Sequence, residues 1–174
     1  MKNKAKVYID GGNIFYTQKK LGWVFDWKKI KKLVEKDKEI IEWKYYVGIK
    51  EDDEKIKKYL KYLDYTGFNV ITKPLKKIRI KKDEVDSKIY KTDYIFKANF
   101  DVEITVDILL DKTKSDEVLS FSGDSDFQYL IKKLKSIGKK VIIYSSKETI
   151  SWELKLEANE VIYFENLKNK IIRK

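Results

Sequence analysis

The segment "KVYIDGGNIFY" (residues 6–16) joins a short apolar run to an apolar-rich stretch through a sharp break. The run climbs to Asp10, breaks at two glycines, and continues from Asn13 with the spacing of a helix. It predicts a buried strand over Lys6–Asp10. A carboxylate at the end of a strand has two explanations, a helix cap or one arm of a metal site. Asn13 is placed to orient Asp10 or a metal-bound water.

A second segment, "SGDSDF" (residues 122–127), has the same form: an apolar strand, a small-residue turn, a carboxylate and a helix. A helix N-terminus favours Asp124 through the helix dipole in any case. Asp126, two residues on, reaches the same space from the first turn. Hydrogen bonds to these carboxylates or to a substrate are expected from Ser122 and Ser125.

Strands and helices alternate along the whole chain. The apolar patterns predict strands at Lys6–Asp10, Glu39–Ile49, Phe68–Thr72, Val118–Ser122, Lys140–Tyr144 and Val161–Phe164. Helices are predicted at Asn13–Lys20, from the cap Asp26 through Glu35, and at Asp53–Thr66, Asp101–Leu110, Ser125–Ser136 and Thr149–Ala158. This alternation favours an α/β fold with a parallel sheet covered on both faces. Ligands of such sheets bind at the carboxyl ends of the strands, where Asp10 and Asp124 lie.

A third candidate segment is "KANFD" (residues 97–101), which leads into the predicted helix at Asp101. Along that helix, Asp107 lies about 120° around and roughly 9 Å further on, so one ion does not easily take both. We expect Asp101 to be a metal ligand and Asp107 to support it. A helix cap at Asp101 and a solvated or structural role for Asp107 are the alternatives. Lys97 is a candidate for binding the scissile phosphate, or a surface lysine.

The composition narrows the chemistry. The chain has 174 residues, no histidine and no cysteine, which excludes Ser-His-Asp and Cys-His mechanisms and histidine-ligated zinc sites. Carboxylate-only oxygen sites suit Mg²⁺ or Mn²⁺, as one or two ions. There is no apolar run long enough to span a membrane and no signal-peptide core, so we expect a cytoplasmic protein without a membrane partner.

Charge is unevenly distributed. The net charge is +11, yet residues 98–131 contain eight acids and only two bases. An AT-rich genome explains the lysine count but not this acidic island, which a metal-dependent nuclease requires. Residues 73–82, "KPLKKIRIKK", with Ser87–Lys97 as a hairpin partner, suit single-stranded nucleic acid; a lysine-protected edge strand is the alternative. The candidate phosphate-binding residues there are Lys76, Lys77, Arg79, Lys81 and Lys82, with Tyr90 and Tyr94 nearby.

The segments "VYIDGGNIFY", "KANFDVEITVDILLD" and "SFSGDSDFQYLIKKLKSIGKKVIIYS" together resemble the NYN domain, in particular its LabA-like branch, which is related to the PIN-like nucleases. The family pattern is a strand ending in D-x-x-N, then K-G-x-x-D or K-G-x-D with a second Asp six residues on, then S-G-D-x-D-F before a helix. The resemblance spans about residues 5–146. Ala98 stands where the family commonly has Gly, and residues 73–97 have no counterpart in the pattern.

The resemblance implies a PIN-like three-layer α/β/α sandwich with a mostly parallel central sheet. It also implies a divalent-metal site built from Asp10, Asp101, Asp124 and Asp126, with Asn13 beside Asp10, and cleavage of RNA. A non-catalytic RNA-binding or regulatory protein and a DNA-directed nuclease remain alternatives. A haloacid-dehalogenase-type phosphatase is disfavoured, because Gly12 stands where that mechanism needs an aspartate.

We expect a single domain over residues 1–174, with a basic hairpin-like insertion near 73–97 and a basic C-terminal tail over 165–174. The end of this tail is either frayed or packed against a partner, and a homodimer stays open. Four tryptophans are expected to be core or helix-packing residues rather than stacking platforms: Trp23, Trp27, Trp43 and Trp152. Phe127 is expected to anchor the core.

Overall fold

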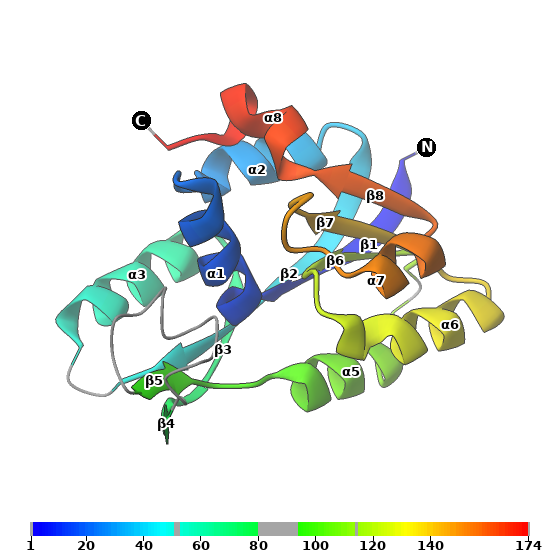
Figure 1. The fold of residues 1–174 in the computed structure, drawn as a ribbon. Helices are drawn as coiled ribbons and strands as arrows, with labels where there is room; N and C mark the ends of the chain where they lie inside the picture. Colours follow the sequence, from blue (N-terminus) through cyan, green and yellow to red (C-terminus); the bar gives the residue numbers. More distant parts are fainter. Residues whose placement is uncertain (1, 51–52, 80–93, 114, 174) are drawn as a thin grey trace.

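The computed structural model describes residues 2–50, 53–79, 94–113 and 115–173, and it is built around one parallel sheet (Figure 1). The six strands lie in the order β3-β2-β1-β6-β7-β8, and every neighbouring pair is parallel. Their bounds are Asn3–Asp10 (β1), Lys38–Ile49 (β2), Asn69–Pro74 (β3), Glu117–Phe121 (β6), Lys140–Ser145 (β7) and Glu160–Tyr163 (β8). The predicted α/β class with a parallel sheet is confirmed.

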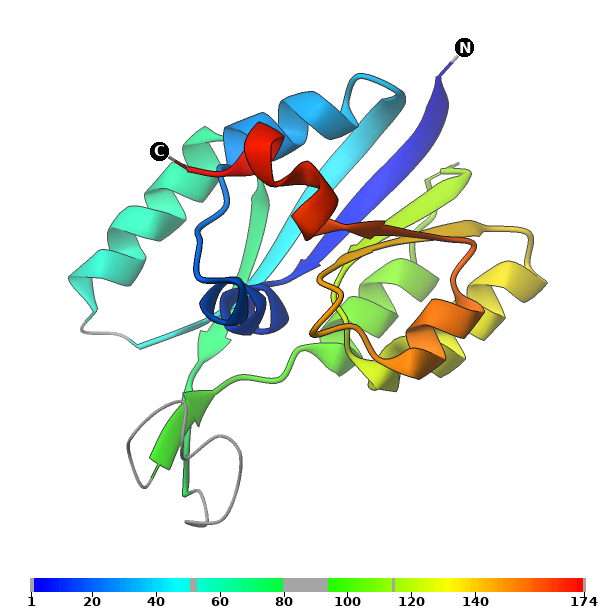
Figure 2. The same ribbon diagram turned by 45° about the horizontal axis from the view of Figure 1, so that its top comes forward.

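Helices cover both faces of this sheet (Figures 1 and 2). One face packs against α1 (Gly11–Leu21), α2 (Trp27–Val34), α3 (Glu54–Tyr65) and α8 (Phe164–Ile171). The other packs against α5 (Asp101–Leu109), α6 (Gln128–Ser136) and α7 (Trp152–Glu157). Because β1, β2, β6 and β7 contribute buried side chains to both apolar clusters, the predicted three-layer α/β/α sandwich is also confirmed.

Polar caps set where most of these helices begin. Asp26 caps α2 as predicted, accepting the backbone N–H of Lys29 at 3.1 Å. Three starts differ from the prediction. Helix α1 begins at Gly11 and not at Asn13, because Asp10 caps it. Ser125–Phe127 forms a 3-10 turn, η1, before α6 begins, and α7 starts at Trp152 because Ser151 caps it there.

The C-terminal residues are held to the body of the protein, so a frayed end is wrong for the part that the structure describes. Helix α8 buries Ile171, and the backbone N–H of Asp26 donates to the carbonyl of Ile171 at 2.8 Å. A β-bridge between Phe25 and Ile172 continues this contact. The apolar residues in the middle of the basic tail therefore anchor it to α2 and the segment before it.

The tryptophans do not all behave as expected. Trp23, Trp27 and Trp43 are buried, and so is Phe127, as predicted. Trp152 is 68% exposed, so its predicted core role is wrong. It comes directly after the cap Ser151, and Leu154 is the residue that buries α7 against the sheet.

A two-stranded antiparallel ribbon projects beyond the carboxyl end of β3 (Figure 2). It consists of β4 (Lys76–Arg79) and β5 (Tyr94–Lys97), and we call it the arm. The predicted hairpin pairing is thus present, while Lys81, Lys82 and Tyr90 lie outside the described residues. No described helix is long and apolar enough to cross a membrane.

Candidate functional site

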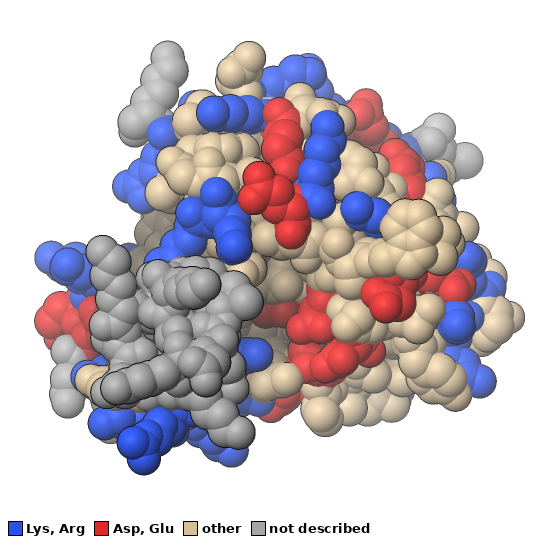
Figure 3. All heavy atoms as spheres, in the orientation of Figure 1, with Lys and Arg blue, Asp and Glu red and all other residues tan. Residues whose placement is uncertain are grey.

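Three carboxylates converge where β6 ends and α5 begins. Single oxygen atoms of Asp101, Asp124 and Asp126 all lie within 4.8 Å of one another, and we call these three residues the acidic cluster. Figure 3 shows acidic side chains gathered over this part of the surface, beside a hollow. Two of the three are partly buried and Asp126 is exposed. The sequence predicted all three as metal ligands.

Asp101 is the first residue of α5 and not its cap. Phe100 occupies the N-cap position of α5 and makes no side-chain capping bond. The backbone N–H of Asp101 donates instead to Asn99 Oδ1 at 2.8 Å. The capping alternative therefore does not hold for Asp101, and Asn99 is a site residue that the sequence reasoning missed.

Asp124 is both a cap and a member of the acidic cluster. Its Oδ1 accepts the backbone N–H of Asp126 at 3.1 Å, which starts η1 and draws Asp126 toward it. One turn thus supplies two of the three carboxylates. The D-x-D spacing in the sequence is the local signal for this geometry.

Asp10 lies beside the acidic cluster but is not one of its three members. Its Oδ1 accepts the backbone N–H of Asn13 at 3.1 Å, so it caps α1. The hydroxyl of Ser122 donates to Asp10 Oδ2 at 3.3 Å and accepts the backbone N–H of Asp124 at 3.3 Å. Ser122 therefore connects the two strand-end turns, as its predicted supporting role requires.

The side chain of Asn13 has a different partner from the one expected. Its Oδ1 accepts the backbone N–H of Gly123 at 3.0 Å, so only its backbone contacts Asp10. Asn13 thus lies beside Asp10 as expected, but it contacts Asp10 through its backbone N–H and not through its amide. Asn13 instead joins the turn after β1 to the turn after β6, and this fixes the separation of the two turns.

Gly123 is the point where three segments meet closely. A Cβ atom at this position would lie 2.3 Å from the carbonyl oxygen of Thr149, so any larger residue would push the two apart. The backbone N–H of Ser151 donates to the Gly123 carbonyl at 2.9 Å. These contacts fix the start of α7 next to the turn that contains Asp124.

Burial and neighbouring acids disfavour the negative charges of Asp10 and Asp101. Burial raises the pKa of Asp10 to about 6; the Asn13 N–H lowers it, and the charges of Asp101 and Asp124 raise it further. Burial likewise raises the pKa of Asp101; Asn99 lowers it, Asp124 and Asp126 raise it, and the nearby charge of Lys97 lowers it. Among the described residues, no lysine or arginine forms an ion pair with a member of the acidic cluster. A bound cation would therefore relieve a real repulsion.

Asp107 and Ser125, predicted to support the metal ligands, and Lys97, predicted to bind phosphate, lie outside the acidic cluster. Asp107 accepts hydrogen bonds from Lys44 at 2.9 Å and from the Tyr46 hydroxyl at 2.7 Å, and no described hydrogen bond links it to the acidic cluster. Ser125 is exposed at the start of η1. Lys97 ends β5 and is close enough to Asp101 to influence its pKa.

Comparison with known proteins assigns the chain to a family. The profile of the NYN domain matches residues 4–166. The chain belongs to the NYN domain family. It is 29% identical over 171 residues to the low amplitude and bright protein LabA of Synechococcus elongatus, an alignment that covers 97% of this chain and 88% of LabA.

A solved structure shares the fold of this NYN domain. A protein of unknown function from Vibrio parahaemolyticus superposes with a TM-score of 0.78 and 25% sequence identity. The match covers 99% of this chain and 97% of that one. The family, which is part of the PIN-like nuclease superfamily, and the likeness to LabA support a nuclease-type or RNA-related function.

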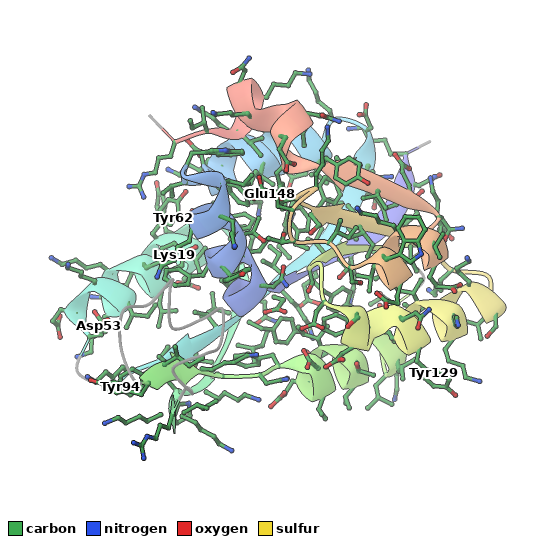
Figure 4. The ribbon with its side chains drawn as sticks, in the orientation of Figure 1. Lys19, Asp53, Tyr62, Tyr94, Tyr129 and Glu148 are labelled. Atoms are coloured by element: carbon green, nitrogen blue, oxygen red, sulfur yellow. The ribbon has the colours of Figure 1, made fainter. Side chains whose placement is uncertain are left out.

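The arm adds a basic, aromatic surface to this NYN domain. Its described strands contain four cations and no acid: Lys76, Lys77, Arg79 and Lys97. Lys77 Nζ lies 4.0 Å from the ring centroid of Tyr94, and Tyr94 lies edge-on to Phe96 with centroids 5.6 Å apart. Figure 4 places Tyr94 on β5, at the far side of the arm from α5.

The root of the arm is fixed to the sheet. The backbone N–H of Leu75 donates to the Ile49 carbonyl at 2.9 Å. Leu75 and Ala98, from the two ends of the arm, close over Gly48, where a Cβ atom would lie 2.4 Å from Leu75 Cδ2. The segment between Lys97 and Asp101 is short, so the basic strands lead directly to the acidic cluster.

Proposed function

We propose that this protein is a divalent-metal-dependent ribonuclease that hydrolyses phosphodiester bonds of single-stranded RNA. The observation that carries the proposal is the convergence of the Asp101, Asp124 and Asp126 carboxylates within 4.8 Å. Three like charges at this separation repel one another, and no described ion pair offsets the repulsion. Such an arrangement is typical of a functional site, and a bound cation would stabilise it.

The donor atoms fit Mg²⁺ or Mn²⁺. The acidic cluster offers only carboxylate oxygens, which hard cations prefer, and the chain has no cysteine or histidine to recruit softer metals. We assign Asp101, Asp124 and Asp126 as ligands and Asp10 as the adjacent fourth acid. A bound ion supplies charge neutralisation for the phosphate and an activated water at neutral pH.

The protein's own groups fix this arrangement. Ser122 holds Asp10 in place, Asn99 accepts the backbone N–H of Asp101, and Asn13 joins the two strand-end turns. Positioned carboxylates need no reorganisation when charge develops on the phosphate. Asn13 and Ser122 therefore act as positioning residues.

The basic surface of the arm suits the substrate. Lys76, Lys77, Arg79 and Lys97 offer four positive charges to phosphates, and Tyr94 and Phe96 are exposed aromatic residues on the same ribbon. A single strand has accessible base faces as well as phosphates, whereas a duplex hides its bases. This pairing of lysine with aromatic rings favours the single strand.

The test is cleavage of labelled RNA and DNA oligonucleotides by the purified protein in Mg²⁺, Mn²⁺ or EDTA. We expect RNA cleavage that EDTA abolishes. Asp124→Asn should lose it, because an asparagine still caps η1 but contributes no charge to the cluster. Asp53→Asn is the matched control: Asp53 caps α3 in the same way and lies away from the acidic cluster (Figure 4).

Each other result has a defined meaning. Cleavage that survives EDTA or Asp124→Asn would reject the metal site. RNA binding without cleavage under either metal would favour the non-catalytic RNA-binding protein, and preferential cutting of DNA would favour the DNA-directed nuclease.

A further inference from the structure

Trp152 stands apart from the other tryptophans. Trp23, Trp27 and Trp43 are at most 9% exposed, whereas Trp152 is 68% exposed. A single exposed apolar residue is ordinary on a protein surface. The position of this one is what distinguishes it.

Hydrogen bonds fix Trp152 beside the turn that contains Asp124. It is the first residue of α7, directly after Ser151, whose backbone N–H donates to the Gly123 carbonyl at 2.9 Å. Ser151 Oγ caps the helix at Leu154 N, and the buried Leu154 anchors it. Helix α7 also lies against η1, the 3-10 turn that contains Asp126. The start of α7, where Trp152 is the first residue, is therefore held next to the turn that contains Asp124.

The arm and α7 lie on opposite sides of the start of α5 (Figures 1 and 2). A strand that follows the lysines of the arm to the acidic cluster continues toward α7 on the other side. On this path the backbone of the strand would cross the three carboxylates, and the nucleotides beyond the scissile phosphate would reach α7, whose first residue is Trp152.

We propose that Trp152 stacks on a nucleobase next to the cleaved bond and thereby selects single-stranded RNA. This inference rests on the function proposed above. An indole stacks on any base, so the contact gives a preference for unpaired strands without a preference for sequence. In an A-form duplex the base faces are covered, so the same ring has nothing to stack on.

A protein partner explains the exposure less well. Leu156, four residues on, is 66% exposed and shares a helix face with Trp152. Two side chains on a six-residue helix are a small patch beside the roughly 800 Å² that each partner buries in a standard interface. A larger exposed apolar group lies on and after α5: Val102, Val106, Leu109 and Leu110.

The experiment uses full-length Asp124→Asn protein in Mg²⁺ with short RNAs that contain the fluorescent base 2-aminopurine at successive positions. We expect quenching when the probe occupies one position, because stacking on indole quenches it. Trp152→Ala should abolish the quenching and weaken binding about tenfold, while Trp152→Phe keeps most of both. Tyr65→Ala is the matched control, since Tyr65 is 83% exposed but ends α3 at the opposite edge of the sheet.

Three results would overturn the inference: no quenching at any position, equal loss in Tyr65→Ala, or an unchanged RNA affinity with an altered oligomeric state in Trp152→Ala. The last would assign Trp152 to a protein contact. The readout is separate from catalysis. Trp152-dependent quenching in a protein that cuts no RNA supports the stacking site and rejects the ribonuclease, and RNA cleavage by the wild-type protein without quenching in the Asp124→Asn protein does the reverse.

Discussion

Two groups of carboxylates lie along the same face of the sheet, in opposite surroundings. Asp101 starts α5 and shares the acidic cluster with Asp124 and Asp126, without an ion pair among the described residues. Six residues along α5, Asp107 is paired with Lys44 at 2.9 Å. Asp111 follows the helix and is paired with Lys6 at 2.8 Å.

The pKa values separate the two groups. Burial raises the pKa of Asp107 and of Asp111, but donors outweigh it in both and hold the pKa below its usual range: Lys44 and Tyr46 for Asp107, Lys6 and Thr113 for Asp111. The pKa of Asp101 is raised. On α5, Asp107 thus stabilises the fold through its ion pair, whereas the negative charge of Asp101 has no ion-pair partner among the described residues. This difference is expected where a carboxylate binds a cation.

The largest expected effect comes from comparing Asp101→Asn with Asp107→Asn. We expect Asp101→Asn to reduce cleavage about 1000-fold, since loss of a ligand exceeds the 10–100-fold cost of losing an outer partner, and to leave stability unchanged or higher. Asp107→Asn should keep activity and lose about 1 kcal/mol of stability with its charged hydrogen bonds. Cleavage rates measure the activity of both variants and urea unfolding measures their stability. If Asp107→Asn lost the activity and Asp101→Asn lost the stability, the assignment of the two carboxylates to different roles would be wrong.

Among the lysines that pair with Asp107 and Asp111, Lys6 should contribute most to stability. It is 7% exposed and also contacts Glu42 at 3.1 Å. Lys6→Met leaves Asp111 and Glu42 without their cation and should lower the free energy of unfolding by about 3 kcal/mol. Lys4→Met, on the same strand, breaks only the exposed 3.8 Å pair with Glu39 and should cost under about 0.5 kcal/mol. Similar losses in denaturant titrations would show that burial of the pair is unimportant.

The acidic cluster and the neighbouring Asp10 were largely predictable from the sequence, because their signals are local. Asp10 ends an apolar strand and Asp124 follows one after a short turn, each before a helix, and parallel strands bring such ends to one edge. The D-x-D spacing of residues 124–126 sets the capping turn by itself. Asp101 follows from a helix start. Nothing longer than six residues is needed to recognise any of these turns.

The ion pairs of Asp107 and Asp111 were not predictable, because they depend on the register of the strands. Lys6 reaches Glu42 through the β1–β2 pairing, which shifts by one residue between Ala5 and Lys6. The Asn13–Gly123 bond likewise spans 110 residues. The apolar side chain of Trp152 suggested a buried position. In the structure Leu154 is the buried residue of α7 and Trp152 is exposed.

Asp10, beside the acidic cluster, and Asp111, in its ion pair with Lys6, should change the stability in opposite directions as the pH changes. The pKa of Asp10, raised from 3.8 to about 6, means that the folded state binds more protons between these values, so stability falls as pH rises through them. The lowered pKa of Asp111 means that stability falls as pH drops through 3.8 and below. In EDTA, Asp10→Asn should gain about 2 kcal/mol relative to wild type between pH 4 and 7. The deficit of Asp111→Asn should shrink below about pH 4. Parallel curves for the two variants would contradict this.

Mg²⁺ should stabilise the folded protein through the acidic cluster alone. An ion that binds only the folded state raises the free energy of unfolding by about 1.4 kcal/mol when its concentration is roughly ten times its dissociation constant. Asp101→Asn should lose this gain, and Asp107→Asn should keep it, because only Asp101 faces the cluster. Thermal unfolding with Mg²⁺, against NaCl of equal ionic strength, separates binding from screening. If NaCl stabilised as well as Mg²⁺, or if Asp101→Asn kept the full gain, the convergence of these carboxylates would not be a cation site.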